Sequence, residues 1–191
     1  MISSRYRRRS KARGRLLGAC LQMVGLAGLS MAQTSGTWTN ATSGGAWSES
    51  DNWLDGIVAD GAGATGLFNS IDITTDNTVH LDAPRTIGNL TFGDTATNTP
   101  AGWILDNNGS ALNILTLAGT TPTITVNALG TNVWDRSATI SAEIAGSGGL
   151  AVRANPPPNH AAGSRAGVSG AGTSAPVLPA WCSSVSNGTF S

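Results

Sequence analysis

The chain has 191 residues, and its eleven basic and eleven acidic side chains give a formal net charge of zero at pH 7. Seven of the basic residues lie within the first fifteen positions, where no acidic residue occurs. The remainder of the chain is therefore acidic, which argues against a nucleic-acid-binding function because such proteins carry basic patches.

The first element in chain order is a predicted secretory signal peptide, residues 1–32. Its basic segment is followed by an apolar run of about 14 residues, 16–29, shorter than the roughly 20 that cross a bilayer as a helix. Ser30 and Ala32 then supply the small side chains that signal peptidase favours. We expect cleavage after Ala32, export of the chain, and no membrane span in the mature protein.

Two other interpretations of this segment stay open. Residues 17–20 resemble a bacterial lipobox ending in Cys20, although only four apolar residues would separate Arg15 from that cysteine. The basic cluster alone resembles a nucleic-acid-binding arm, but the apolar run directly after it favours export. Cleavage after Ala32 would leave four arginines against eleven acids, a formal charge of −7, and Cys182 as the single cysteine. No intramolecular disulfide is then possible.

Residues 33–68 form a region marked by Trp38, Trp47 and Trp53. If these rings are buried, they form an N-terminal cap that shields the first layer of the fold from solvent. If they are exposed on a β-surface, they form a platform on which the rings of a surface glycan can stack. Trp38, Trp47 and Trp53 are therefore the candidate glycan contacts of this sequence, with the cap as the favoured interpretation.

Residues 61–66 match the GxGxxG pattern of dinucleotide-binding proteins. That pattern requires a helix directly after it, because the helix N-terminus holds the pyrophosphate. The residues that follow, with Ile71 and Ile73, alternate as in a strand. We expect a flexible loop here and no nucleotide.

Carboxylates are the candidates for metal binding or catalysis. One short stretch contains Glu49, Asp51, Asp55 and Asp60. Their spacing fits neither an EF-hand nor a calcium β-roll, so we interpret them as solvated loop acids. A pair of acids of the kind that glycosidases use would have to come from a second group: Asp72, Asp76, Asp82, Asp94 and Asp106.

The two histidines add no metal site to these carboxylates. His80 lies between Val79 and Leu81, so we expect it on the wet face of a strand, whereas His160 lies near the C-terminus. Neither has a cysteine or a second histidine at a spacing typical of metal ligands. We predict no metal, no cofactor and no enzymatic activity.

Residues 69–150 read as short strands separated by turn residues, because apolar side chains alternate with polar ones. Strands are expected near residues 72, 80, 91, 104, 116, 125 and 142. The fold class is therefore all-β. The many threonines and asparagines and the lack of lysine after the leader favour a partial parallel β-solenoid (β-helix), with a small β-sandwich as the alternative.

Four blocks in order carry a resemblance to a known family: WTNATSGGAWSESDNWLDG (38–56), HLDAPRTIGNLTFGD (80–94), GWILDNNGSALNILTLAGTTPTITV (102–126) and ISAEIAGSGGL (140–150). Over residues 36–150 the chain resembles exported bacterial proteins with autotransporter-associated β-strand repeats. The resemblance implies a long parallel β-solenoid at the cell surface and carries over no catalytic residues.

The chemistry of the sequence changes after Leu150. Residues 151–191 contain no acidic residue, five of the eight prolines and no clear alternation. We interpret them as a disordered tail, or as the product of a shifted reading frame that truncates a longer repeat protein.

The function expected from all of this is a structural or adhesive one. The protein would be exported to the periplasm, the cell surface or the medium, with surface glycans or other cell-surface proteins as partners. The alternatives are a carbohydrate-binding module that uses the tryptophans or, with less support, a polysaccharide-degrading β-helix enzyme.

Overall fold

The structure is a computed structural model that describes residues 32–99, 101–130, 136–155, 167–173 and 184–190, the last two ranges by their backbone alone. All of them belong to one compact unit, Met31–Ser191. The regular structure of these residues is almost entirely strand, which confirms the all-β prediction. Apart from Ala32, the predicted signal peptide lies outside the described residues, as do His160 and Cys182.

The elements are short strands with two single-turn 3-10 helices near the start. In chain order they are β1 (Gly36–Thr37), β2 (Gly45–Ala46), η1 (Ser50–Asn52), η2 (Leu54–Gly56), β3 (Gly61–Phe68), β4 (Asn77–His80), β5 (Arg85–Phe92), β6 (Trp103–Asp106), β7 (Leu115–Leu117), β8 (Thr123–Val126), β9 (Ala138–Ile140), β10 (Ile144–Gly146), β11 (Ala151–Ala154), β12 (Gly167–Thr173) and β13 (Ser184–Phe190).

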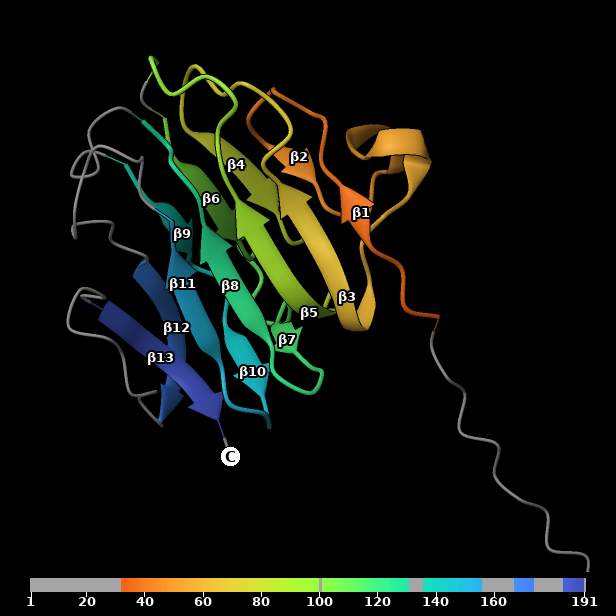
Figure 1. Ribbon diagram of the computed structural model, residues 1–191. Helices are drawn as coiled ribbons and strands as arrows, with labels where there is room; N and C mark the ends of the chain where they lie inside the picture. Colours follow the sequence, from red (N-terminus) through yellow and green to blue (C-terminus); the bar gives the residue numbers. More distant parts are fainter. Residues whose placement is uncertain (1–31, 100, 131–135, 156–166, 174–183, 191) are drawn as a thin grey trace, which may run out of the picture. The chain divides into compact units, whose positions relative to one another are not determined.

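These strands pair in parallel along two arms (Figure 1). The first arm runs β1-β3-β5-β7-β10, with β8 and β11 continuing from β5, and the second runs β2-β4-β6-β9. The backbones of β13 and β12 join the far ends of the two arms. The sheet neither closes nor curls on itself, so the β-solenoid remains a prediction.

In-register columns of apolar side chains fill the space between the arms. Leu90 on β5 pairs with Ile124 on β8, and both are buried. From the opposite arm, Trp103 on β6 reaches Phe68 on β3, with ring centroids 5.6 Å apart. Since successive side chains of a strand point to opposite faces, the residues between these apolar ones face outward. The predicted alternation is confirmed in β4, β5, β7 and β8.

Two predicted strands differ from the structure. No strand forms around residue 72; instead, Ile73 is buried and its N–H donates to Asp94 Oδ1 at 3.3 Å. The strand expected around residue 142 is divided into β9 and β10 by a corner, where the N–H groups of Ser141 and Ala142 both point at the Leu105 carbonyl. Apolar and polar residues also alternate in segments of irregular backbone, so the alternation around residues 72 and 142 did not correspond to one continuous strand in either case.

The glycine-rich segment expected to be a loop is the strand β3. Gly61 and Gly63 have φ values of 103° and 80°, and the register against β5 shifts between Gly61 and Thr65, as in a bulge. A Cβ on Gly88 would lie 2.3 Å from Gly63 Cα, so glycine is required where the two strands touch. The loop interpretation is therefore wrong. The sequence did not reveal this strand because its glycines pack through their main chain and leave no alternation of apolar and polar side chains. No helix follows the glycines.

The segment after Leu150 also differs from the structureless tail that we expected. Ala151–Ala154 is a strand, β11, that pairs in parallel with β8, and Val152 packs on the hydrophobic core. The backbones of Gly167–Thr173 and Ser184–Phe190 are strands as well. The stacked strands therefore continue at least four residues beyond Leu150, because Val152 continues the column of Leu90 and Ile124.

Candidate functional site

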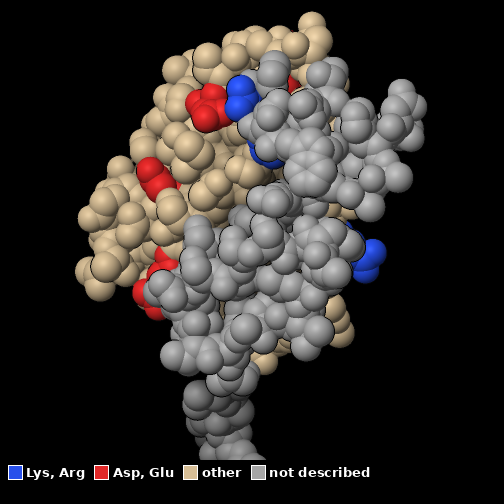
Figure 2. Space-filling view, turned by 90° about the vertical axis from the view of Figure 1, so that its left-hand side faces the viewer, with Lys and Arg blue, Asp and Glu red and all other residues tan. Residues whose placement is uncertain are grey.

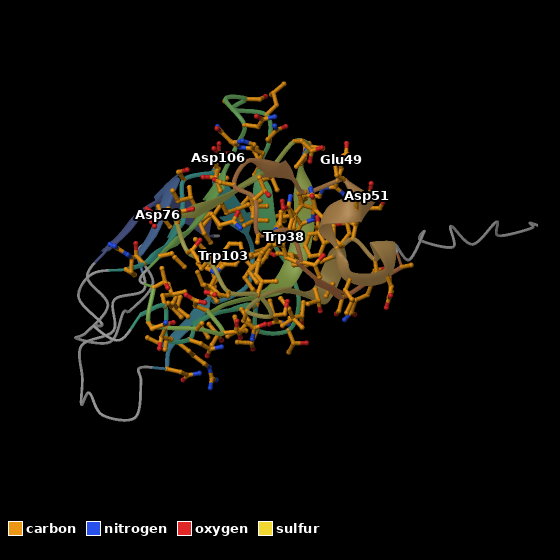
Figure 3. All side chains as sticks on the ribbon, turned by 90° about the horizontal axis from the view of Figure 1, so that it is seen from above. Trp38, Glu49, Asp51, Asp76, Trp103 and Asp106 are labelled. Carbon is orange, nitrogen blue, oxygen red and sulfur yellow. The ribbon has the colours of Figure 1, made fainter. Side chains whose placement is uncertain are left out.

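The three candidate glycan contacts lie together at the N-terminal end of the fold. Trp38 follows β1, Trp47 follows β2, and Trp53 follows η1. Trp53 packs edge-on against both others, with ring centroids 5.2 Å from Trp38 and 5.1 Å from Trp47, and Phe68 lies within 5.8 Å of all three. Figure 3 shows Trp38 and Trp103 pointing into the interior of the molecule.

All three rings are buried, with exposed fractions of 0% for Trp38 and Trp47 and 2% for Trp53. Their indole N–H groups donate to main-chain carbonyls: Trp38 to Asn40 at 2.7 Å, Trp47 to Ala59 at 2.9 Å and Trp53 to Trp47 at 2.7 Å. A sugar needs an exposed ring face to stack on. The glycan-contact interpretation of these residues therefore has no surface to support it, whereas the cap interpretation fits their burial.

Polar side chains tie the segments of this cap together. Asn52 Nδ2 donates to the Ala46 carbonyl at 2.8 Å, while its Oδ1 accepts from Asn40 Nδ2 at 2.7 Å. The main chain of Trp38 forms an antiparallel bridge with that of Trp53, and Thr34 forms one with Asp60. These bridges give the N-terminal strand an antiparallel partner, which ends the parallel stacking on that side.

Along the first arm, a column of corner residues follows the carboxyl ends of successive strands. Asn69, Gly93, Asn127 and Asn155 each come directly after β3, β5, β8 or β11. The N–H groups of Gly93, Asn127 and Asn155 donate to the carbonyl of the last residue in the neighbouring strand, which is β3, β5 and β8 respectively, at 2.8 to 3.0 Å. Asn155 Nδ2 also donates to Asn127 Oδ1 at 3.0 Å. Among the described strands, β11 pairs with β8 alone.

The first group of acids does not gather into a metal site. Glu49 directly precedes η1 and Asp51 lies within it, apart from Asp76 and Asp106 (Figure 3). Asp60 Oδ2 lies 3.5 Å from Arg85 Nη1. Across the described part of the chain, no three His, Cys, Asp or Glu side chains are close enough to hold a metal ion. On the face that Figure 2 presents, the acidic side chains lie in separate small groups.

The second group of acids mainly holds neighbouring segments of the chain together. Asp76 Oδ1 accepts from Gly102 N–H at 2.7 Å, and Asp82 accepts from both the main chain and the hydroxyl of Ser48. Asp106 accepts from Asn108 N–H at 2.9 Å and pairs with His80 Nδ1 at 2.7 Å. Except for the local contact between Asp106 and Asn108, these contacts join segments that are remote in sequence.

Asp94 is the acid with the most perturbed environment. Burial raises the pKa of its carboxyl above the ordinary value, opposed by main-chain hydrogen bonds to Ala96, Ile73 and Thr95, and the nearby Asp72 charge raises it further. Its Oδ1 accepts from Ile73 and Ala96, while its Oδ2 is buried without a hydrogen-bond partner. Its hydrogen bonds to the main chain of Ile73 and Ala96 hold the corner after β5 together, which fits a structural acid.

His80 lies on the outward face of β4, as we predicted, with its side chain about 30% exposed. It is in register with Asp106 on β6, and this register brings the two side chains into contact. The sequence did not indicate this pair, because local alternation leaves the register between β4 and β6 undetermined. The pair adds a polar link on the outside of the second arm.

The hollows on the described surface include two whose lining contains candidate acids. One, of about 360 Å³, is lined by Ala32, Asp60, Gly61, Ala62, Pro84 and Thr86. The other, of about 110 Å³, is lined by Asp76, Gly102, Trp103, Ile104, Arg136, Ser137 and Thr139. Neither brings a nucleophile together with a base in hydrogen-bond contact, the arrangement that covalent catalysis needs.

Comparisons of the chain with protein-family models, with curated proteins and with solved structures find no match. Within the described residues, no helix has the length and apolar character that a membrane-spanning helix requires.

Proposed function

We propose that the chain is an exported, non-catalytic β-repeat protein, the capped beginning of a parallel β-solenoid with a structural or adhesive role at the bacterial surface. The periplasm and the medium are the alternative destinations. Its partners would be surface glycans or other cell-surface proteins, and it would need no cofactor. The proposal agrees with the sequence resemblance to proteins with autotransporter-associated β-strand repeats.

The observation that carries this proposal is the stacking of equivalent positions in successive passes of the chain. Val79, Leu105 and Ile140 form one column on the second arm, and Leu90, Ile124 and Val152 form another on the first. Repeat proteins are built in this way, because each unit buries its apolar side only against its neighbours. A sandwich built from hairpins would pair neighbouring strands antiparallel, whereas the strands β1–β13 pair in parallel.

A structural role is favoured over catalysis because the polar side chains of the described region are used for cohesion. Asp76, Asp82 and Asp106 bind other segments of the same chain. A carbohydrate-binding module based on Trp38, Trp47 and Trp53 would need at least one exposed ring, and all three are buried. The outward positions of the first arm are small polar residues such as Thr91 and Thr125, which suit a long, weakly charged contact surface.

The experiment that tests the proposal uses bacterial cells that produce the full chain. We expect the processed protein in the exported fraction, its removal from intact cells by added protease, and increased attachment of these cells to one another or to a glycan-coated surface. The control is the same host producing residues 33–191 without the leader. Retention of the full chain in the cytoplasm, or attachment equal to the control, would contradict the proposal.

The stacked register is tested separately with cysteine pairs in a Cys182→Ser background. Thr91→Cys with Thr125→Cys places two cysteines at paired positions of adjacent strands, about 4.8 Å apart and within the range that a disulfide spans. Thr91→Cys with Thr78→Cys, on strands of different arms, is the control. Ready oxidation of the first pair alone is expected, and equal oxidation of both pairs would reject the register.

A further inference from the structure

The first residue of the expected mature chain, Gln33, lies on the glycine-rich bulge of β3. Directly after it, Thr34 exchanges two main-chain hydrogen bonds with Asp60, each 2.8 Å long. A Cβ built on Gly61 would lie 3.0 Å from Gln33 Cα, so the main chain of residue 33 passes directly over this glycine. The chain is thus fixed to the fold within one residue of the expected cleavage point.

The side chain of Gln33 lies over the second glycine of the bulge. A Cβ on Gly63 would be 3.2 Å from Gln33 Oε1, 3.4 Å from its Nε2 and 3.5 Å from its Cδ. Gly61 and Gly63 both have positive φ, and neither has a side chain that would contact the glutamine. Gln33 itself is exposed, so its side chain has room to turn back toward its own main-chain nitrogen.

The surroundings suit an uncharged chain terminus. Beside Gln33 lies a hollow of about 360 Å³, whose lining includes Ala32, the residue that cleavage would remove, together with Ala62 and Pro84. The Asp60 carboxylate in that lining is already engaged: its Oδ1 accepts from Gly61 N–H at 2.9 Å, and its Oδ2 lies 3.5 Å from Arg85 Nη1. Both oxygens of this carboxylate therefore already have partners within the fold.

We propose that Gln33, once freed by cleavage after Ala32, closes to an N-terminal pyroglutamate that rests on the Gly61–Gly63 bulge; this rests on the proposed export. The unprotonated α-amino nitrogen attacks Cδ of its own side chain. The new N–Cδ bond forms as the bond from Cδ to the carboxamide nitrogen breaks, and one amine proton leaves with that nitrogen as ammonia. The terminus loses its positive charge, and no oxidant, reductant or cofactor is consumed.

Peptide mass spectrometry of the full chain purified from the exported fraction tests this inference. We expect an N-terminal peptide that begins at residue 33 and is lighter by one ammonia than the peptide with free glutamine. The matched control is Gln33→Asn, which keeps a carboxamide but is one methylene too short to form the five-membered ring. We expect this variant to be cleaved at the same position and to keep its full mass.

A second measurement reports on the blocked terminus in the folded protein. A general aminopeptidase should release no residue from the wild-type mature chain and should trim the Gln33→Asn variant. Treatment of the wild-type chain with a pyroglutamyl peptidase should make it susceptible to the aminopeptidase as well. A mature chain that begins at residue 33 with free glutamine overturns the cyclisation while leaving export intact. A chain that keeps its leader, or that begins elsewhere, overturns the cyclisation together with the expected cleavage site.

Discussion

The two ends of the stacked strands are finished in opposite ways. At the N-terminal end, the main chains of Trp38 and Trp53 form an antiparallel bridge, and their indole rings are buried beneath it. At the other end, β11 pairs with β8 alone among the described strands, and Val152 at its middle is only partly buried. Because unpaired strand edges accept further strands, the antiparallel bridge closes the first end at β1, whereas β11 leaves an edge without a second strand partner among the described residues.

This contrast explains why the aromatic residues are concentrated where they are. A strand in the middle of an arm has a parallel neighbour on each side, and medium-sized residues such as Leu90 and Ile124 fill the core there. The first strands have a parallel neighbour on one side only, so other side chains must cover the apolar surface at that end. Three indole rings and Phe68 do so here, with the indole N–H groups satisfied by main-chain carbonyls.

The largest expected effect is therefore at the closed end. Trp53→Ala removes the ring that packs against both other tryptophans, and we expect it to lower the free energy of unfolding by about 3–5 kcal/mol. Chemical denaturation of the purified chain, followed by circular dichroism, measures this loss.

The neighbouring residue provides the control for that variant. Leu54 is 52% exposed, so Leu54→Ala should change the unfolding midpoint little. Because Trp53→Ala risks complete unfolding, Trp53→Phe serves as a milder variant that keeps a ring but loses the hydrogen bond to the Trp47 carbonyl. If Trp53→Phe and Leu54→Ala were equally harmless, the three tryptophans would not be the structural cap.

The contrast between the ends is sharpened by substitutions along one column. Leu90→Ala, deep in the first arm, should cost about 2–5 kcal/mol. Val152→Ala, in the same column at the open edge, should cost about 1 kcal/mol or less, because its side chain is already partly in water. Denaturation of the two variants under identical conditions gives the comparison, and a similar loss for both would mean that another segment covers β11.

The sequence predicted these columns better than it predicted the two ends. Leu90/Phe92 and Ile124/Val126 alternate with polar residues, and period two is the direct signature of a strand with one buried face. In β3 that signature is missing, because Gly61, Gly63 and Gly66 contribute backbone contacts and no apolar side chain. A pattern of hydrophobicity in the sequence indicates which side chains are buried. It does not indicate where main chains pack closely against each other, as at the glycines of β3.

The candidate site was less predictable, since burial of a tryptophan depends on what the rest of the chain places over it. The sequence allowed both an exposed platform and a cap for Trp38, Trp47 and Trp53, and the burial of all three rings favours the cap. The pairing of His80 with Asp106 likewise depends on a register between two strands. Such pairings are long-range properties that local alternation leaves undetermined.

The smallest predicted effect concerns Asp94, at the corner after β5, between the closed and the open end. Its pKa is raised in the folded protein above the ordinary value of 3.8, chiefly by burial, so the folded chain holds this proton more tightly than the unfolded chain does. The contribution of Asp94 to stability is therefore most favourable below pH 3.8 and declines as the pH rises from there through the raised value.

Asp94→Asn tests this sign. The amide keeps an oxygen that accepts from Ile73 and Ala96, but it carries no charge to desolvate and no charge to be repelled by Asp72. We expect the variant to be slightly more stable than the wild type at neutral pH and to lose this part of the decline in stability between acidic and neutral pH. Unfolding midpoints measured across that range report it, with Asp72→Asn as the control for the repulsion alone. An unchanged pH profile would mean that Asp94 is as well solvated in the fold as in the unfolded chain, and the corner would then be an open loop instead of part of the packed stack between the two ends.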